Sequence, residues 1–328
     1  MKKIGIIGAG AWGTALAMVA RRAGREAIIW AFEPEVVAAI NGDHENISYL
    51  PGVALDRKIA ATADMAAAVD ADALMLAVPA QFLRAACVRL AAVIGEGLPV
   101  VICAKGIERQ SNALPGEIVN QILPRTPVAV LSGPTFAAEV ACGLPTAVTL
   151  ACADAKLAAD IAEAVGSPRF RIYGSDDVIG AQIGGAVKNV LAIASGIVEG
   201  RGLGDNARAA LITRGLAEIA RLSAAKGGKA ETLMGLSGLG DLILTCTAMQ
   251  SRNFSLGAAL GKGERLKDIL SRRRSVAEGV ATASSVSSLA RSMSIDMPIC
   301  LAVDGILHGG LDIDLTIAGL LARPPGNE

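Results

Sequence analysis

The chain is short of histidine, of aromatic residues and of net charge. His44 and His308 are its two histidines in 328 residues, so we expect lysines or carboxylates to do any proton transfer. Aromatic residues make up 3% of the sequence and apolar residues 52%, a balance typical of closely packed helices around a buried parallel sheet. Basic and acidic residues both number 31, which leaves no basic excess for a nucleic-acid partner.

Cysteine pairs and long apolar runs are missing as well. The six cysteines form no C-x-x-C pair; they are Cys87, Cys103, Cys142, Cys152, Cys246 and Cys300. We expect buried thiols in a reducing cytoplasm, with neither a disulfide framework nor a metal site. Glycine, proline or a charged residue interrupts every apolar run before 18 residues, so we predict no membrane span and no stable membrane insertion.

The stretch 4–13 is the most informative part of what is present. It has the pattern of an apolar strand that continues into G-x-G-x-x-G and a helix over 14–23. Gly8 permits a tight turn, Gly10 lets the backbone approach a pyrophosphate, and Gly13 lets the helix lie close to the strand. The free N–H groups and the dipole of the helix N-terminus then face the phosphates. A dinucleotide is therefore the expected ligand.

Two other interpretations of this stretch exist. It can be an ordinary glycine-rich turn, or a signal peptide in which Lys2 and Lys3 precede the apolar run. A signal peptide does not need glycines at this spacing. A second apolar strand at 27–30, at the distance of a β-α-β unit, also favours the dinucleotide site.

The following 150 residues alternate between strand-like and helix-like segments. Strands are predicted at 73–78, 99–104, 128–131, 146–151 and 170–173, with a helix at 155–165 and an irregular segment at 41–58. From about residue 179, alanine-rich helical patterns replace the strands, and we predict helices at 184–199, 206–226, 277–293 and 298–308. The sequence thus predicts a doubly wound α/β domain over 1–180 and an all-helical domain over 181–328. The basic run 272–274 is interpreted as a solvated helix end.

The end of the second strand is where such a domain reads the adenosine ribose. Phe32 and Glu33 stand there, and we expect Phe32 beside the adenine. A carboxylate at this point favours the free 2′-OH of NAD, whereas a nearby arginine accepts the 2′-phosphate of NADP. The other interpretation of Glu33 is a helix N-terminal charge ahead of Pro34.

Two lysines are candidates for the chemistry. Lys105 follows the predicted strand 99–104, where a polar side chain faces the ligand crevice, although it can also be a solvated loop residue. Lys188 and Asn189 lie within a nearly all-apolar helix. A buried lysine has an easily shifted pKa and is a good proton donor to a carbonyl; a lysine that snorkels from a helix edge is the alternative.

Two polar groups of the helical domain complete the candidates. Asp241 follows a glycine-rich loop at a helix start, with Thr245 one turn later, and a simple N-cap is its other interpretation. Arg252 is flanked by Ser251 and Asn253, a set of donors that suits a phosphate, although a surface turn is also possible. One carboxylate and several cations beside a nicotinamide site suggest a small phosphorylated substrate.

These residues carry a resemblance that runs nearly from end to end. The chain resembles the bacterial NAD(P)-dependent glycerol-3-phosphate dehydrogenases in the blocks GAGAWGTALA, AKGIE, LSGPTFAAEVACGLPTA, IGGAVKNVLAIASGI, NARAALITRGLAE, GLSGLGDLILTCT and QSRN. The resemblance implies a Rossmann-like domain followed by a helical domain, in a cytoplasmic homodimer. It also implies interconversion of dihydroxyacetone phosphate and sn-glycerol 3-phosphate with NAD(H) or NADP(H), which supplies phospholipid synthesis.

The resemblance also implies roles for individual residues. Lys188 would be the acid/base residue, Asp241 would orient it, and Lys105 would add positive potential near the developing charge. The implied substrate contacts are Lys105, Gly133, Thr135, Lys188, Asn189, Asp241, Thr245, Ser251, Arg252 and Asn253. The implied cofactor contacts are Gly8, Gly10, Ala11, Trp12, Gly13, Phe32, Tyr49, Lys105, Ala137, Arg252, Val276 and Glu278.

One residue departs from the family. Members commonly have arginine or histidine where this chain has Phe32, and that cation contacts the 2′-phosphate of NADPH. The sequence therefore leaves the choice between NADH and NADPH open, with Arg57 or Lys58 as candidate replacement cations. The rival functions are another two-domain hydroxy-acid dehydrogenase and a non-catalytic dinucleotide sensor.

Overall fold

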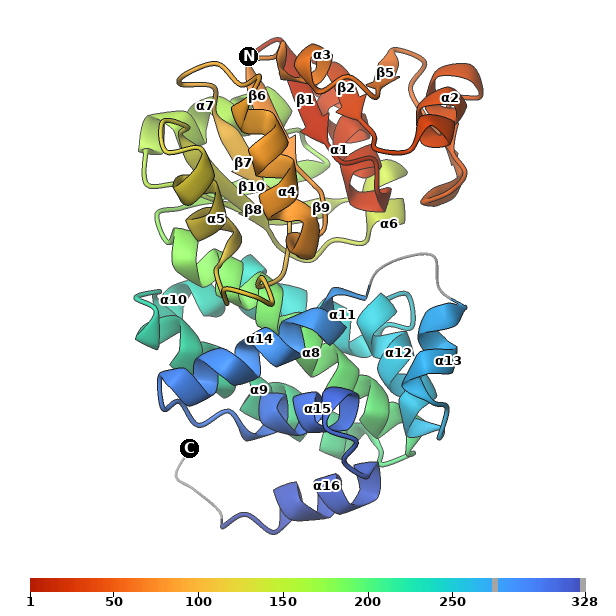
Figure 1. The fold of residues 1–328 in the computed structure, drawn as a ribbon, viewed down its shortest axis with the longest axis vertical. Coiled ribbons are helices and arrows are strands. Elements are labelled where there is room, and N and C mark those ends of the chain that lie inside the picture. Colours follow the sequence, from red (N-terminus) through yellow and green to blue (C-terminus); the bar gives the residue numbers. More distant parts are fainter. Residues whose placement is uncertain (273–276, 325–328) are drawn as a thin grey trace.

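The computed structural model describes residues 1–272 and 277–324. An eight-stranded sheet with helices on both faces forms the N-terminal part, and helices alone form the C-terminal part (Figure 1). The strands lie in the order β10-β9-β8-β7-β6-β1-β2-β5. Their bounds are β1 (Lys3–Ile7), β2 (Glu26–Trp30), β5 (Ile59–Thr62), β6 (Ala73–Leu76), β7 (Val100–Ile102), β8 (Val128–Ser132), β9 (Thr146–Ala151) and β10 (Phe170–Ser175).

The predicted strands are all present, and the structure adds three. The segment 41–58, expected to be irregular, contains the antiparallel ribbon of β3 (Glu45–Asn46) and β4 (Leu50–Ala54), and β5 follows it. The sheet is parallel except at one junction, where β9 pairs antiparallel with β8 and then parallel with β10. The general doubly wound α/β fold is confirmed, with the last two strands running opposite to the rest.

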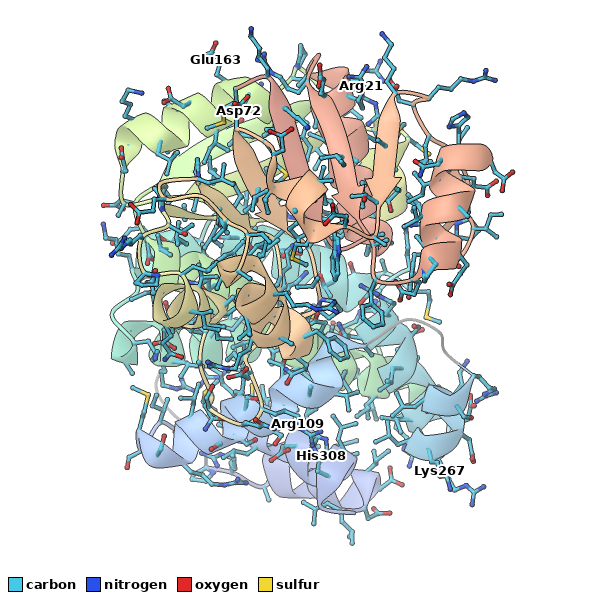
Figure 2. The ribbon with its side chains drawn as sticks, turned by 45° about the horizontal axis from the view of Figure 1, so that its top comes forward. Arg21, Asp72, Arg109, Glu163, Lys267 and His308 are labelled. Atoms are coloured by element: carbon cyan, nitrogen blue, oxygen red, sulfur yellow. The ribbon has the colours of Figure 1, made fainter. Side chains whose placement is uncertain are left out.

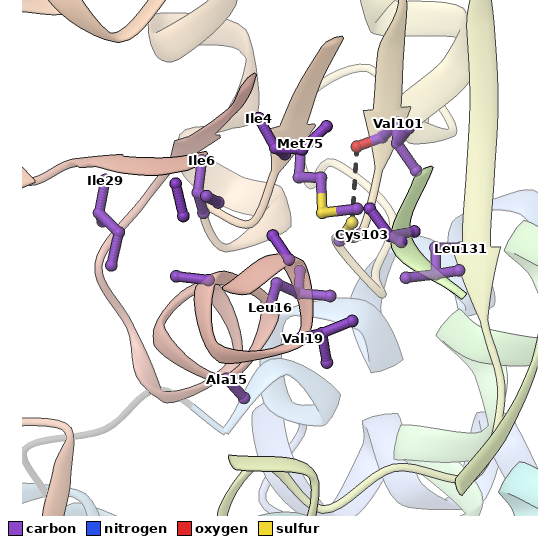
Figure 3. Close-up of a cluster of buried hydrophobic side chains, with 14 of the residues drawn as sticks. Ile4, Ile6, Ala15, Leu16, Val19, Ile29, Met75, Val101, Cys103 and Leu131 are labelled. Carbon is purple, nitrogen blue, oxygen red and sulfur yellow. Dashed lines mark hydrogen bonds between the residues drawn. The ribbon is translucent and has the colours of Figure 1, made fainter. Parts of the chain in front are cut away.

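Successive residues of the central strands point to opposite faces, and both faces are buried. Ile4 and Ile6 of β1 pack against α1 (Ala11–Arg22), whereas Ile7 packs against the other face, which α4 (Ala80–Ala91) covers. Figure 3 shows the first face, where Ile4 and Ile6 lie with side chains of neighbouring strands against Leu16 of α1. Burial on both faces explains why these strands are continuous apolar runs in the sequence.

The remaining helices of this part divide between the two faces. Residues of α2 (Pro34–Gly42), α6 (Ala137–Ala141) and α7 (Ala155–Val165) belong to the same core cluster as α1. Residues of α3 (Met65–Val69) and α5 (Pro115–Ile122) belong to the cluster of α4. The N-terminal part is therefore a three-layer α/β/α structure.

The chain order creates a switch point between β1 and β6. From β1 the chain proceeds outward through β2 to β5, and then returns to β6 on the other side of β1. In open α/β sheets, ligands bind outside the carboxyl ends of the strands at such a point. The glycine turn after β1 and the residues after β6 both lie there.

The glycines of this turn are needed for its shape. Gly8 has a φ of 115°, and a Cβ on Gly13 would lie 1.9 Å from the carbonyl oxygen of Gly8. Helix α1 begins at Ala11, three residues earlier than predicted, because Gly10 already stands at its N-cap. The packing role expected for Gly13 is confirmed.

The helical part is built around α8 (Val178–Gly200), which lies against α9, α11, α12, α14 and α15. The other helices are α9 (Asp205–Ala225), α10 (Ala230–Leu233), the π-helical turn η1 (Leu236–Gly240), α11 (Asp241–Thr247), α12 (Arg252–Gly261), α13 (Leu266–Ser271), α14 (Glu278–Ser292), α15 (Pro298–His308) and α16 (Ile313–Leu321). The four predicted helices are confirmed. The first begins six residues early, because the Asp177 carboxylate caps it by accepting from the Gly180 N–H at 2.8 Å.

Helix α8 is long and apolar enough to cross a membrane by length and composition, but 89% of its most apolar window is buried inside the protein. Its apolar surface is thus covered by neighbouring helices. Charged side chains such as Glu163 and Lys267 lie instead at the outer edges of the molecule (Figure 2). Arg272 ends α13, and the other two arginines of the basic run lie outside the described residues.

The cysteines follow the expectation with one exception. All six are free; five are buried and Cys142 is exposed. Burial raises the pKa of the Cys87 and Cys246 thiols to about 12, so these thiols are unreactive near neutral pH. The prediction that all six are buried is wrong for Cys142, because it ends the short helix α6 at the protein surface.

Candidate active site

A single buried aspartate joins the two candidate lysines. Asp241 is the first residue of α11 and its side chain is 0% exposed. Its Oδ1 accepts a hydrogen bond from Lys188 Nζ of α8, and its Oδ2 accepts one from Lys105 Nζ at 2.8 Å. Because α11 continues directly from η1, Asp241 does not stand at a free helix start, and the N-cap interpretation is wrong.

Lys188 is held on more than one side. Its side chain is 7% exposed, and its Nζ also donates to Thr245 Oγ1 at 2.8 Å, one turn beyond Asp241. Burial lowers the pKa of Lys188 to about 8; the charge of Lys105 acts in the same direction, and Asp241 opposes both. The snorkelling interpretation is therefore wrong, and an amine with this pKa is able to donate or accept a proton near neutral pH.

Lys105 connects this pair to the sheet. It follows β7, its side chain is 16% exposed, and its Nζ donates to the carbonyl oxygen of Gly133 at 2.8 Å. The same Nζ lies 3.4 Å from Thr135 Oγ1. Gly133 and Thr135 belong to the turn after β8, so the carboxyl ends of two strands meet here. The solvated-loop interpretation of Lys105 is wrong.

Two asparagines extend the network into the QSRN segment. Asn189 Nδ2 donates to the carbonyl oxygen of Lys105 at 3.1 Å, and Asn253 Nδ2 donates to Asn189 Oδ1 at 3.0 Å. The Gly279 N–H in turn donates to Asn253 Oδ1 at 3.0 Å. The Asn253 side chain thus ties α12 to α8 and α14, which leaves one of its N–H groups for a ligand.

The start of α12 gathers polar side chains at a helix N-terminus. Ser251 caps the helix, since its Oγ accepts from the Phe254 N–H at 3.2 Å. Ser251 and Asn253 are buried, whereas Arg252 at the first helical position is exposed. The surface-turn interpretation is therefore wrong for two of the three residues. The helix dipole and the Arg252 guanidinium add positive potential at this point.

Glu278 bridges the helical part and the α/β part. Its Oε1 accepts from the Ala80 N–H at the start of α4, at 3.2 Å, and its Oε2 is buried without a hydrogen-bond partner among the described residues. Burial raises the pKa of the Glu278 carboxyl to about 7, while the Ala80 N–H and the charge of Arg252 act in the opposite direction. This orphaned oxygen lies beside the switch point, where a Cβ on Gly106 would come within 2.6 Å of it.

The glycine turn has room for a pyrophosphate. Apart from its two chain neighbours, no residue that the structure describes would come within 4 Å of a Cβ placed on Gly10, so the space in front of the α1 N-terminus is open there. The first-turn N–H groups of Ala11 and Trp12 have no acceptor within the helix. Trp12 Nε1 is likewise buried without a partner in the described part of the chain. These donors and this open space fit the phosphates of a dinucleotide.

Asn46 supports the glycine turn, and no sequence pattern pointed to it. It lies in β3 and is 0% exposed; its Nδ2 donates to the carbonyl oxygen of Ala9 at 2.7 Å and to Thr14 Oγ1 at 2.8 Å. The β3–β4 ribbon therefore braces the glycine turn from outside. A lone asparagine in an irregular segment carries no pattern that distinguishes it from a turn residue.

The segment after β2 has a hydrogen bond at Glu33 and a cation over the ring of Phe32. Glu33 Oε1 accepts from the Tyr49 hydroxyl at 2.8 Å, a bond that raises the pKa of Tyr49, and Glu33 makes no side-chain cap on α2. Phe32 is 68% exposed, and the guanidinium carbon of Arg89 lies 5.5 Å from its ring centroid.

Three further predictions concern the replacement cations for Phe32, the residue Val276 and the residue Ala137. Lys58 and its neighbour Arg57 lie at the start of β5, level with the amino end of β2, so they are at the wrong edge of the sheet to replace a cation at Phe32. Val276 lies outside the described residues. Ala137 begins α6, whose residues pack on α1 behind the glycine turn.

The chemistry available at this site is acid–base and electrostatic. No cluster of three or more histidine, cysteine or acidic side chains suited to a metal ion occurs within residues 1–272 and 277–324. The cluster of Lys105, Lys188 and Asp241 carries two positive charges and one negative charge, which leaves one positive charge for an anionic ligand. The arrangement can hold a phosphorylated carbonyl compound and move a proton to or from its oxygen.

Comparison with known proteins agrees with this geometry. The family model described as the N-terminus of NAD-dependent glycerol-3-phosphate dehydrogenase matches residues 3–158, and the model described as the C-terminus matches residues 177–318. A glycerol-3-phosphate dehydrogenase [NAD(P)+] from Rhodospirillum rubrum is 60% identical over 322 residues, which cover 98% of this chain and 92% of the relative. One from Parvibaculum lavamentivorans is 56% identical over 327 residues, with 100% and 98% covered.

Solved structures give the same result. The crystal structure of glycerol-3-phosphate dehydrogenase from Coxiella burnetii matches with a TM-score of 0.95 and 41% identity, covering 98% of this chain and 99% of that one. A ketopantoate reductase from Ralstonia eutropha matches with a TM-score of 0.59 and 20% identity, and shares the fold alone.

Proposed function

This chain belongs to the NAD-dependent glycerol-3-phosphate dehydrogenase family, and we propose that its buried pair of Lys188 and Asp241 performs the proton transfer of that family's reaction. The protein is an NAD(P)-dependent oxidoreductase that interconverts dihydroxyacetone phosphate and sn-glycerol 3-phosphate. When bound, the dinucleotide supplies or accepts the hydride at carbon 2 of the substrate. Identity over the full length favours this activity over that of another hydroxy-acid dehydrogenase or of a non-catalytic sensor.

The observation that carries the proposal is the position of the Lys188 amine. It is buried, bonded to Asp241 and Thr245, and has a pKa near 8. In the reducing direction Lys188 donates a proton to the carbonyl oxygen as negative charge develops there. In the oxidising direction the neutral amine removes the proton from the hydroxyl. Asp241 keeps the amine oriented through both states, since its carboxylate is fixed between two lysines.

The substrate phosphate is held at the start of α12 in this proposal. Arg252, the free N–H of Asn253 and the Ser251 hydroxyl supply donors, and the helix dipole favours the negative charge. Binding energy from the phosphate then aligns carbon 2 with Lys188. Lys105, with Gly133, Thr135 and Asn189 around it, adds positive potential beside the carbonyl oxygen.

The proposed cofactor contacts fall into three groups, at the pyrophosphate, at the adenosine end and at the nicotinamide end of the dinucleotide. The turn from Gly8 to Gly13 holds the pyrophosphate, and Ala137 borders it from α6. Phe32 and Tyr49 hold the adenosine end, with Glu33 on the ribose. Glu278, Arg252 and Lys105 border the nicotinamide end; Val276 was also predicted as a cofactor contact, but it lies outside the described residues. The open space at Gly10 and the orphaned atoms of Trp12 and Glu278 support this path.

The domain division, the oligomeric state and the cellular location are also proposals. Residues 1–180 form the dinucleotide-binding domain and 181–328 the helical domain, a division supported by the end of β10 at Ser175 and the start of α8 at Val178. We propose a homodimer, supported by α16, where Leu315 and Leu321 are 75% and 81% exposed. A cytoplasmic location without membrane insertion is supported by the free cysteines and the burial of α8. There the product supplies phospholipid synthesis.

Oxidation of NADH and of NADPH with dihydroxyacetone phosphate, followed by absorbance, tests the activity. Oxidation that depends on this substrate and is absent with 2-keto acids is expected. No oxidation of either cofactor, with cofactor still bound, would favour the sensor, and turnover confined to the keto acids would favour the rival dehydrogenase.

A further inference from the structure

The side chain stacked on Phe32 belongs to an arginine that none of the sequence motifs contains. Arg89 lies on α4, and its guanidinium carbon is 5.5 Å from the ring centroid of Phe32 and 5.8 Å from that of Trp30. Arg89 is exposed, and no ion pair of the described residues includes it. The cation is therefore held by aromatic faces while its N–H edges stay free for an anion.

Arg89 lies over the ring of Phe32, which is at the position expected for contact with the adenosine ribose. Phe32 comes two residues after Trp30, the last residue of β2, and the end of this strand is where a doubly wound domain reads the ribose. Glu33 stands beside it with one carboxylate oxygen bonded to Tyr49. A carboxylate favours a free 2′-OH and repels a 2′-phosphate, so NADPH requires a cation here.

No other basic residue considered for this role is in reach. Lys58 is level with Glu26 at the amino end of β2, so its Cα lies roughly 13 Å from the carboxyl end. Arg57 precedes it on the same turn. The guanidinium carbon of Arg89, by contrast, already lies 5.5 Å from the centroid of the ring that stands in place of the usual cation.

We propose that Arg89 binds the 2′-phosphate of NADPH and so replaces the cation missing at Phe32. The planar guanidinium stacks on Phe32 and presents two N–H groups along one edge, which matches the geometry of phosphate oxygens. The same site then accepts NADH through Glu33 and NADPH through Arg89. This assignment rests on the dehydrogenase function proposed above and concerns which cofactor that function uses.

The test compares two nucleotides that differ only in the 2′-phosphate. Calorimetry measures the affinity of 2′,5′-ADP and of 5′-AMP for the wild type and for Arg89→Met, and kcat/KM is measured with NADPH and NADH. Wild type is expected to bind 2′,5′-ADP more tightly than 5′-AMP. In Arg89→Met, the affinity for 2′,5′-ADP and the kcat/KM with NADPH are each expected to fall about tenfold to a hundredfold. The affinity for 5′-AMP and the kcat/KM with NADH should each fall less than about twofold. Arg89→Lys keeps the positive charge but loses the planar guanidinium group, so its affinity for 2′,5′-ADP should lie between those of the wild type and Arg89→Met.

Arg171 provides a matched control. It also stacks on an exposed aromatic ring, 5.6 Å from the centroid of Tyr173, but on β10 at the far edge of the sheet. Arg171→Met should change neither nucleotide's affinity.

Three results would overturn the assignment. The first is an equal loss for both nucleotides in Arg89→Met, which would mean that Arg89 stacks on the adenine. The second is no loss for either, and the third is a wild type that does not prefer 2′,5′-ADP. Turnover of dihydroxyacetone phosphate with NADH, measured on the same samples, reports separately whether the proposed function holds.

Discussion

The Lys188 amine and the Asp241 carboxylate meet in the interior of the protein, 53 residues apart in the sequence. Burying either charge alone would be costly, and breaking such a pair typically costs about 3–5 kcal/mol. The pair is stable because Lys105 and Thr245 bond the remaining sides. The resulting surplus of one positive charge suits a substrate whose carbonyl oxygen becomes negative during reduction.

The first prediction concerns pH. Reduction needs protonated Lys188, so its kcat/KM should fall as pH rises through about 8, the pKa of this amine. Oxidation of sn-glycerol 3-phosphate needs the neutral amine, so its kcat/KM should rise over the same range. Profiles in both directions check this. A reduction rate that stays constant from about one pH unit below to one above that value would contradict the assignment.

The second prediction uses the two groups that shift the pKa of Lys188 in opposite directions. Asp241 raises this pKa and Lys105 lowers it. Asp241→Asn should therefore move the limb of the reduction profile below pH 8, and Lys105→Met should move it above, alongside the loss of activity that both cause. The midpoint of the residual activity is the measurement. Limbs that move in the same direction, or stay fixed, would contradict the electrostatic account.

A control for these variants lies outside the site. Lys226 also pairs with a carboxylate, that of Glu117, and is 20% exposed. Lys226→Met should leave the limb near pH 8.

The third prediction concerns the phosphate. Arg252→Ala should raise the KM for dihydroxyacetone phosphate about tenfold to a hundredfold, with a smaller effect on kcat, because a charge-assisted contact is lost. Dihydroxyacetone lacks the phosphate, so its KM should be the same in the variant and in the wild type. Arg265→Ala, at an exposed arginine paired with Asp268, is the matched control. An unchanged KM in Arg252→Ala would rule out its role as phosphate anchor.

The fourth prediction compares two glycines of the turn after β1, one expected to matter for cofactor binding and the other for folding. Gly10→Ala adds a Cβ that has no contact within 4 Å in the described part of the chain beyond its two neighbours in sequence. The φ of −64° also suits alanine, so stability should fall by less than about 1 kcal/mol. The same methyl group occupies the pyrophosphate space, so NADH affinity should be lost. Gly13→Ala places a Cβ 1.9 Å from Gly8 O and should instead destabilise the fold by about 1–3 kcal/mol or more. Thermal unfolding measures the stability of both variants, and NADH titration measures their cofactor affinity. A Gly10→Ala variant that binds NADH normally would contradict the proposed pyrophosphate site at this turn.

The sequence predicts the fold well where local patterns determine it. Strands buried on both faces are uninterrupted apolar runs, and the helical part has long alanine-rich periods, so both were recognisable. The antiparallel β9 was not, because strand direction depends on the path of the connection and not on the strand's own residues. The β3–β4 ribbon was missed because β4 contains Pro51 and Gly52, which weaken a strand pattern.

The site was predicted as a set of residues but not as a network. A lysine in an apolar helix and an aspartate after a glycine loop were each ambiguous, and their pairing depends on how η1 turns α11 onto α8. Asn253 was expected to face the substrate, yet most of its amide ties three helices together. Arg89 carried no signal, since an arginine on a helix surface reveals nothing about the ring it stacks on.

The most direct test of the account is turnover by Lys188→Ala together with its affinity for NADH. Removal of the proton donor should lower kcat by roughly 10²–10⁴-fold, because that is what general acid catalysis contributes. The dissociation constant for NADH should change little, since Lys188 is not among the predicted cofactor contacts. Lys226→Ala should be as active as the wild type. Turnover within a few-fold of the wild type in Lys188→Ala would contradict the central claim.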